Sequence, residues 1–167
     1  MENTVYCLAS SEPQANEILT HLRNLRFSSS EISILLRDKR TKNISVKEDV
    51  IRGAEKVGIA GGILGAIAGL TALSIPAVGP LLVAGPFLGA LGGAVVGGVV
   101  GGLAGGSGAL THIGIPEAHT ARLEQKIHNG AILIAVHSDN PVKLDKALRV
   151  FKSSGADEIY GEEELAA

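Results

Sequence analysis

Few residues of this chain could carry out chemistry, and their spacing argues against most reactions. Among 167 residues there are five histidines and one cysteine. No two histidines stand at metal-binding spacing with a cysteine or carboxylate as companion, so we expect no metal site. Cys7 lies in an apolar run without an evident base, and we interpret it as a buried hydrophobe. The histidines are His21, His112, His119, His128 and His137.

One group of polar residues is a candidate binding site. Ser10 and Ser11 follow the first predicted strand, and His137, Ser138 and Asp139 end a later one. If these strands are central neighbours in a sheet, the turns after them should lie side by side, each with a helix N-terminus aimed at the gap. Such an arrangement could hold an anion. The alternative, which we keep open, is that these residues are ordinary helix caps.

The composition argues against several other classes of site. No lysine follows Lys56 until Lys126, so the glycine-rich centre contains no phosphate loop of the GxxxxGK[ST] type. The 15 Lys and Arg against 17 Asp and Glu give a net charge of −2, and no basic, aromatic-interleaved patch is visible. We therefore expect no cofactor, no nucleic-acid partner and no catalytic residues, and the sequence identifies no small-molecule ligand.

The elements that would position these residues form two similar arms. In the first arm the pattern predicts a strand over 4–9, a helix from the N-cap Ser11 to about residue 26, and a strand over 32–36. Ser11 and Gln14 are spaced as a capping box. In the second arm we predict a strand over 131–136, a helix beginning near Pro141 after a cap at Asp139 or Asn140, and a strand over 158–160.

Two β-α-β units in one chain are typical of the ferredoxin-like fold, so we predict an α+β domain with a split β-α-β arrangement. The domain would comprise 1–38 and 130–167, with a basic amphipathic connector (39–56), a glycine-zipper helical hairpin (57–110) and an amphipathic helix (111–129) between them. The strand over 131–136 is apolar on both faces, which predicts a second covered face of the sheet. Its cover would be a partner subunit or the helix over 116–128, through Ala118, Leu123 and Ile127.

The central segment has no charged residue between Lys56 and Glu117 and contains most of the 22 glycines. We predict one helix over 57–75, a turn over 76–80, and a second helix that begins near Leu81 or Pro86 and ends near residue 107. Glycines four residues apart line one helix face and let two backbones approach closely. The predicted packing interface is Gly61, Gly65, Gly69, Gly85, Gly89, Gly93, Gly97, Gly101 and Gly105.

The cost of these glycines bears on their surroundings. Each glycine inside a helix costs about 1 kcal/mol relative to alanine in water, whereas in a bilayer an unpaired backbone amide costs several kcal/mol and holds the helix together. This comparison favours a hairpin embedded in a lipid bilayer. A zipper buried between subunits of a soluble oligomer and a re-entrant hairpin stay open as alternatives. If the hairpin spans, the basic residues before it place both termini in the cytoplasm.

The sequence resembles the small bacterial general-stress, low-temperature-induced proteins. The resemblance covers nearly the whole chain and rests on the glycine-rich hairpin with its Ile75–Pro86 turn (IPAVGPLLVAGP), on Gly114–Ala118 (GIPEA) and on Asn129–His137 (NGAILIAVH). It implies a stress-linked, membrane-associated or self-assembling protein and supplies no catalytic residues. A weaker similarity is to accessory subunits of bacterial quinol-oxidising complexes. If this chain had such a role, the role would be scaffolding.

Together these features lead us to expect a non-enzymatic protein that forms a homo-oligomer through its glycine-zipper hairpins. With the resemblance, its expected place is the bacterial inner membrane with both termini in the cytoplasm, or alternatively a cytoplasmic assembly such as a shell or filament. The rival interpretation is a membrane-anchored sensor, in which the small domain binds a ligand or partner at the Ser10 and His137 group.

Overall fold

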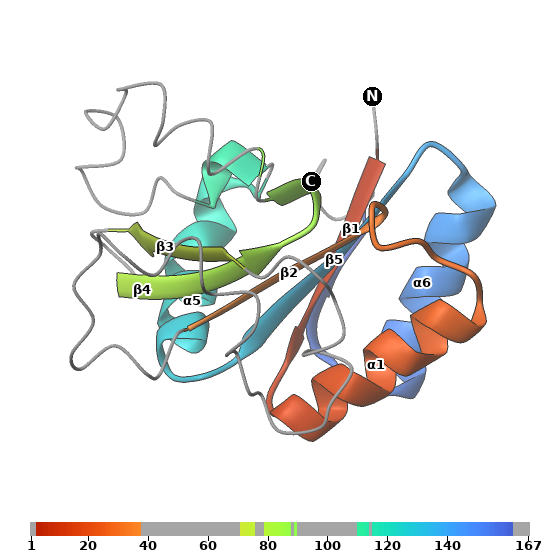
Figure 1. The fold of residues 1–167 in the computed structure, drawn as a ribbon, viewed down its shortest axis with the longest axis horizontal. Helices are drawn as coiled ribbons and strands as arrows, with labels where there is room; N and C mark the ends of the chain where they lie inside the picture. The colour runs from red at the N-terminus through yellow and green to blue at the C-terminus, as the bar shows by residue number, and fades with distance from the viewer. Residues whose placement is uncertain are drawn as a thin grey trace.

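A computed structural model describes residues 3–37, 71–75, 79–87, 89, 110–113 and 115–161. Both charged arms and a short central part of the chain contribute regular elements (Figure 1). In chain order these are β1 (Asn3–Ala9), α1 (Glu12–Asn24), β2 (Ile32–Arg37), β3 (Thr71–Ile75), β4 (Gly79–Ala84), the 3₁₀ helix η2 (Thr111–Ile113), α5 (Glu117–His128), β5 (Ile132–Ser138), α6 (Pro141–Ser153) and β6 (Asp157–Tyr160).

The two arms build one sheet rather than two. Its six strands run in the order β3-β4-β2-β5-β1-β6, and all neighbours are antiparallel. β5 of the second arm lies between β1 and β2 of the first arm, and β1 in turn lies between β5 and β6. Because each arm inserts a strand into the other, neither arm has a complete sheet of its own. The prediction of an α+β fold is confirmed, and strands of both arms share one sheet.

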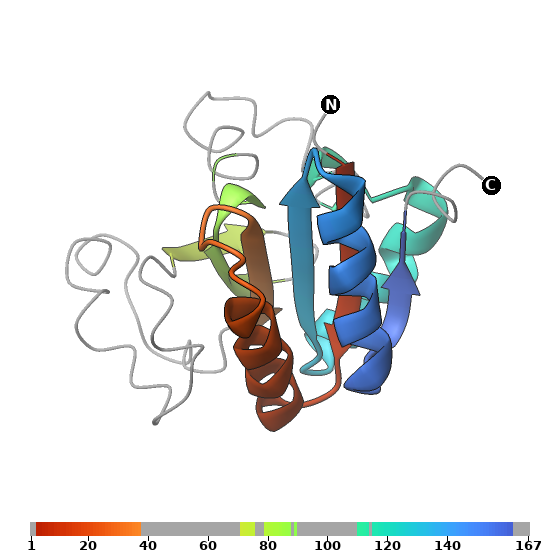
Figure 2. The same cartoon turned by 90° about the vertical axis from the view of Figure 1, so that its right-hand side faces the viewer.

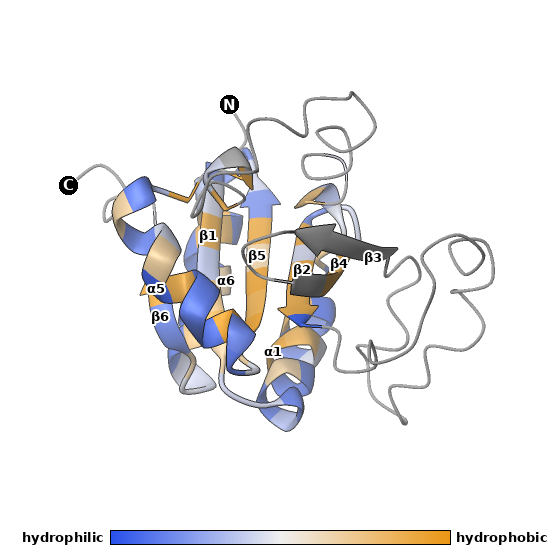
Figure 3. Ribbon diagram, turned by 90° about the vertical axis from the view of Figure 1, so that its left-hand side faces the viewer, coloured by the Kyte–Doolittle hydropathy of each residue, from blue (hydrophilic) through white to orange (hydrophobic). Residues whose placement is uncertain are grey.

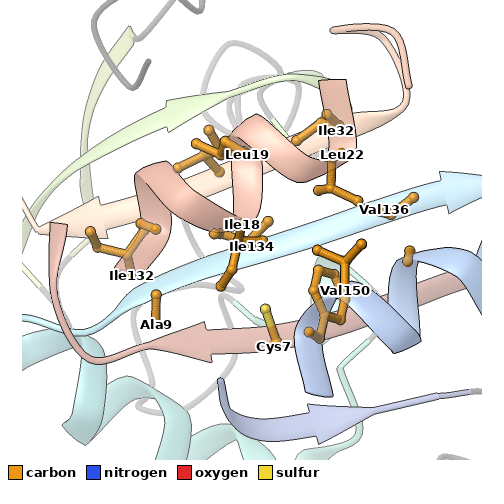
Figure 4. Close-up of a cluster of buried hydrophobic side chains, with 14 of the residues drawn as sticks. Cys7, Ala9, Ile18, Leu19, Leu22, Ile32, Ile132, Ile134, Val136 and Val150 are labelled. Carbon is orange, nitrogen blue, oxygen red and sulfur yellow. The ribbon is translucent and has the colours of Figure 1, made fainter. Parts of the chain in front are cut away.

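Helices α1 and α6 cover one face of the sheet and enclose the first core (Figures 2 and 4). Ile18, Leu19 and Leu22 of α1 recur at helical spacing and pack on Ile134 and its alternate neighbours in β5. Burying such side chains removes apolar surface from water and is the main force that holds the helices on the sheet. Cys7 lies fully buried in this core, as expected.

The second face of the sheet is covered too, as the two-sided apolar pattern of β5 predicted. Leu123 and Ile127 of α5 pack with Leu133 of β5 in a second core, on the side opposite α1 and α6 (Figure 3). The chain therefore supplies this cover itself. Ala118 was predicted to face the sheet, but it is exposed, and Thr120 is buried instead, because Thr120 and not Ala118 stands at helical spacing from Leu123 and Ile127.

Both helix starts in the arms follow their predicted caps. The Ser11 Oγ accepts a hydrogen bond from the Gln14 N–H at the start of α1, and the Ser10 N–H donates back to Gln14 Oε1 at 2.7 Å. Of the two candidate caps of α6, Asn140 is the one used: its Oδ1 accepts from the Val142 N–H at 2.9 Å. These bonds satisfy backbone donors that have no partner inside the helix.

The centre of the chain departs from the prediction. Residues 71–75 were expected in a helix and the turn over 76–80 at its end, but β3 and β4 are strands that pair with each other and extend the sheet beyond β2. Leu82 faces the first core while Leu81 and Val83 face the second, which is the two-residue alternation of a strand. The prediction of a helical hairpin joined at 76–80 is therefore wrong, because Ile75 and Gly79 are paired residues of two neighbouring strands.

The later helix start at Pro86 agrees with the structure, in which residues 86, 87 and 89 are helical. In the part of the chain that the structure describes, no helix has both the length and the apolar character needed to cross a bilayer. The basic connector (39–56) and seven of the predicted packing glycines lie outside the described residues. These glycines are Gly61, Gly65, Gly69, Gly93, Gly97, Gly101 and Gly105.

Candidate functional site

The predicted Ser10 and His137 group is not assembled. β1 and β5 are central neighbours, but they are antiparallel, with Ala9 opposite Ile132 and Asn3 opposite Ser138. The turn after β1 therefore lies at one end of the strand pair and the turn after β5 at the other, roughly 20 Å apart at ~3.4 Å per residue. For the same reason the N-termini of α1 and α6 lie at opposite ends of the sheet (Figure 2).

The separated residues act as caps and turn contacts. Ser10 and Ser11 belong to the start of α1, and Gln14 fastens that turn to the end of α6 through bonds from its Nε2 to the Ser154 and Gly155 carbonyls. Ser138 Oγ accepts from the Asn140 N–H, and Asp139 is exposed. The shared anion site expected from the sequence is wrong, and the sensor interpretation loses the pocket on which it depended.

His137 instead joins a different polar group on the second face of the sheet. Its Nδ1 lies 3.0 Å from the Thr4 Oγ1, and its Nε2 lies 2.8 Å from the Ser33 Oγ. Thr4 is directly opposite His137 across the β1–β5 pair, and Ser33 is opposite Ala135, one pleat away. Adjacent strands thus place the three side chains in one row across the sheet.

The row continues into the segment that follows β4. The Phe87 N–H donates to the Ser33 Oγ at 3.0 Å, and the Phe87 ring meets the His137 ring edge-on with centroids 5.1 Å apart. Tyr6 stacks on Phe87 with ring centroids 6.4 Å apart, and the Tyr6 hydroxyl donates to the Ile113 carbonyl at 3.3 Å. We call Thr4, Ser33, Phe87 and His137 the polar bridge, because it ties the chain beyond β4 to the sheet.

A glycine makes this approach possible. Gly85 has a φ of +79°, and an added Cβ would overlap the Ile32 carbonyl oxygen and lie 2.9 Å from the Ser33 Cα. Only a residue without a Cβ allows the chain to turn so close to β2 and place Phe87 over Ser33. The predicted role of Gly85 in helix packing is therefore wrong, since it forms the turn. Gly89 is exposed, and no described residue lies within 4 Å of its Cβ position.

The chemistry open to the polar bridge is limited by burial. A serine hydroxyl 2.8 Å from an imidazole has the geometry of a nucleophile and its base. Ser33 is fully buried, however, and its oxygen already accepts the Phe87 N–H. The third member is a threonine hydroxyl, which lacks the negative charge with which a carboxylate stabilises an imidazolium. The geometry thus fits a structural link that satisfies buried polar groups.

Burial also governs the two other ionisable side chains of the sheet interior. It raises the pKa of the Tyr6 hydroxyl, with a hydrogen bond to Thr4 acting in the opposite direction. Burial raises the pKa of the Cys7 thiol as well. The neutral thiol is a poor nucleophile and a poor metal ligand, so Cys7 is suited to packing rather than reaction.

Three glutamates outside the bridge have shifted pKa values. The pKa of Glu31 is lowered, first by the hydrogen bond from Lys143 at 2.6 Å and then by those from Ser28. Burial raises the pKa of Glu124, whose Oε1 has no hydrogen-bond partner among the described residues. For Glu158 burial acts upward, but bonds from Lys126 and Tyr160 and the nearby Lys126 and Arg122 charges leave its pKa below the usual value.

Thr4, Ser33 and Phe87 were missed in the sequence, although a signal for Ser33 exists. It is the one polar residue in the otherwise apolar run over 32–36, and a polar side chain buried in a central strand requires a hydrogen-bond partner. The antiparallel register would then have identified Thr4 as the residue opposite His137. Phe87 could not be identified in this way, because its position depends on the turn at Gly85.

Comparison of the chain with family models, with curated proteins and with solved structures finds no match. Within the described ranges, no cluster of three or more His, Cys, Asp or Glu side chains is placed to hold a metal ion.

Proposed function

We propose that this chain is a non-enzymatic assembly protein, whose α+β domain holds a glycine-rich segment in place so that it packs against a second copy. The observation that carries the proposal is the anchor at the end of β4. There Gly85 turns the chain against β2, and the Phe87 N–H bonds to Ser33. A buried polar network therefore holds Phe87 in place, and Phe87 lies at the start of the most glycine-rich stretch of the chain.

We assign the domain to the ferredoxin-like fold. The strand order β6-β1-β5-β2, with α1 and α6 on one face, supports this assignment, because each β-α-β unit receives a strand of the other between its own two strands. On this assignment β3 and β4 are an addition to the edge of the fold next to β2. The β3–β4 addition would then attach the glycine-rich stretch to the ferredoxin-like domain and hold it in a fixed position.

The contact between copies would run along the glycines that follow the anchor. Gly89 is exposed and has open space at its Cβ position. Gly93, Gly97, Gly101 and Gly105 continue its four-residue spacing. On a helix this spacing forms one smooth ridge, on which the absence of Cβ atoms lets a second backbone approach closely.

A second copy is a better partner for this ridge than a bilayer. Phe87 before the stretch and Leu110 after it both pack in the second core, so the chain returns to the domain from which it leaves. A single crossing of a membrane cannot do this, and two crossings need about 40 residues at ~20 per crossing. Contact with lipid is the second candidate, favoured by the absence of charge between Lys56 and Glu117.

The test is the mass of the full-length protein by size-exclusion chromatography with light scattering. Replacing Gly93 and Gly97 together by Leu adds side chains to the ridge and should convert the oligomer to smaller species. The matched control replaces Val95 and Val99 by Leu, which adds volume to the same stretch away from the ridge, and should keep the wild-type mass. An oligomer unaffected by the glycine substitutions would refute the proposal, as would a monomeric wild type.

A flotation experiment separates the second candidate from the first. Wild-type protein is mixed with vesicles of phosphatidylethanolamine and phosphatidylglycerol and centrifuged through a density gradient. The proposal expects the assembled protein to stay at the bottom. Protein that floats with the vesicles, and no longer does so after the Gly93 and Gly97 substitutions, would establish lipid as the partner of the ridge instead.

A further inference from the structure

The two edges of the sheet are built differently. At the β6 edge the register with β1 shifts between Tyr6 and Leu8, and Glu158 has a left-handed φ of 48°. The Glu158 carboxylate also takes ion pairs from Arg122 and Lys126 of α5. An irregular, charged and short edge strand is a common protection against pairing with another chain.

Among the residues that the structure describes, the β3 edge has none of these features. Its five residues, Thr71–Ile75, contain no charge and no proline, and they pair with β4 without a register shift. The nearest charged residues in the sequence are Lys56 and Glu117. A regular, uncharged edge strand presents a row of backbone donors and acceptors to a further strand.

Hydrogen bonding across the sheet identifies which backbone groups β3 presents. The His137 N–H donates to the Glu31 carbonyl, so odd-numbered residues of β5 and β2 face each other. The same alternation continues through the registers of β2 with β4 and of β4 with β3. The backbone N–H and C=O groups of Leu73 therefore point towards β4, and those of Ala72 and Ser74 point to the outer side of the sheet. Pro80, which has no N–H, fits this alternation because it points away from β3.

We propose that β3 pairs antiparallel with β3 of a second copy, about a two-fold axis at Leu73, and so joins two sheets into one. In this register Ala72 and Ser74 of one copy exchange backbone hydrogen bonds with Ser74 and Ala72 of the other. A second copy is the occupant because the two-fold repeat makes this pattern self-complementary. β3 itself carries no charged residue, so pairing two copies of it adds no like-charge repulsion within the strand pair and offers no ionic contact there to a charged partner.

This inference builds on the proposed self-association and assigns it a specific interface. A five-residue strand pair buries little surface, and a stable interface needs about 1,200–2,000 Å² in total. The strand pair would therefore set the geometry of a dimer, and contacts of the glycine ridge would supply the remaining area. The two contributions can be disrupted separately, because β3 and the ridge are different parts of the chain.

Disulfide trapping in the full-length protein tests the register. Directly opposite residues in a non-hydrogen-bonded pair have Cα atoms ~4.5 Å apart, within the ~4.4–6.8 Å that a disulfide spans. Leu73→Cys should therefore form a covalent dimer under mild oxidation. Ile75→Cys is the matched control, because its copies would lie roughly 14 Å apart along the paired strands. The wild type, whose single cysteine is buried, gives the background.

The expected result is a cross-linking rate at residue 73 about tenfold or more above that at residue 75, because only the former pair meets disulfide geometry. Adding Ala72→Pro to Leu73→Cys removes an outward donor and should return the rate to background. Adding Ala72→Val instead keeps the N–H and should preserve cross-linking, and thermal melts check that both variants fold. Equal rates at residues 73 and 75 would overturn the inference.

The outcomes also separate this inference from the proposed function. If the oligomer depends on Gly93 and Gly97 but does not cross-link at residue 73, the glycine-ridge contact is supported and the β3 pairing is refuted. Specific cross-linking at residue 73 in a protein whose mass ignores the glycine substitutions rejects the ridge and keeps the strand pair.

Discussion

Ser33 and His137 are 104 positions apart in the chain but lie on neighbouring strands, with the Ser33 Oγ 2.8 Å from the His137 Nε2. The same Ser33 oxygen accepts the Phe87 N–H, so one hydroxyl links β2, β5 and the start of the helix after β4. Removing that hydroxyl should uncouple the glycine-rich stretch from the domain.

Ser33→Ala should destabilise the protein by about 1–3 kcal/mol, because it leaves a buried N–H of Phe87 and a ring nitrogen of His137 without this partner. Urea denaturation followed by circular dichroism measures the change. The control is Thr4→Val, which removes the hydrogen bonds of Thr4 with His137 and Tyr6 at the half-buried end of the bridge and should cost less. Equal losses in the two variants would show that Ser33 has no special place in the bridge.

Gly85→Ala should cost about 2–4 kcal/mol, from a left-handed backbone and from the overlap with the Ile32 carbonyl. Gly89→Ala is the control in the same stretch. Its Cβ position is open, and alanine inside a helix is favoured over glycine by up to about 1 kcal/mol. Thermal melts of both variants should therefore shift in opposite directions. A Gly85→Ala protein as stable as wild type would contradict the turn described above.

The Glu31–Lys143 ion pair should contribute stability only when Glu31 is charged. Since the folded-state pKa is lowered, the contribution is complete above the unfolded value near 4.3 and is lost as the pH falls through the folded pKa. Glu31→Gln should thus be less stable than wild type at pH 7, by less than about 1 kcal/mol for so exposed a pair. The difference should vanish only once the pH lies below the lowered folded-state pKa.

The exposed Glu17 provides the control for that experiment. Glu17→Gln removes a carboxylate that has no ion pair or hydrogen bond among the described residues, so it controls for the loss of a surface carboxylate as such. Guanidinium denaturation at a series of pH values would measure all three proteins. A Glu31→Gln difference that stays constant down to the lowest pH would argue against a charge effect.

Glu124→Gln should behave in the opposite sense. Burial raises the pKa of Glu124 in the folded state, so its charged form costs stability at pH 7, and this cost falls as the pH drops through the raised pKa. The variant should melt at a higher temperature than wild type at pH 7, and the gain should disappear towards pH 4. Scanning calorimetry at both pH values provides the measurement, and a variant less stable than wild type at pH 7 would refute it.

The sequence by itself determined the elements of the two arms, because each is specified by local chemistry. Helical spacing of Ile18 and Leu22, the capping box of Ser11 and Gln14, and the two-sided apolar pattern of 131–136 do not depend on distant residues. The coverage of both faces of the sheet followed from that last pattern alone. Local patterns also offered Pro86, as one of two alternatives with Leu81, for a helix start, and residues 86, 87 and 89 are helical.

Only the tertiary structure decided the identity of β3 and β4 and the partners of His137. A short apolar run such as 79–84 suits a helix or a strand equally well, and the open edge of β2 provided the hydrogen bonds that made it a strand. Likewise, His137 could be assigned to a strand from the sequence, but its partners depend on strand direction. The antiparallel register carried it away from Ser10 and brought Thr4 and Ser33 within hydrogen-bonding distance. Strand direction is a property of the whole sheet, because each strand's direction is set by the neighbours with which it shares backbone hydrogen bonds.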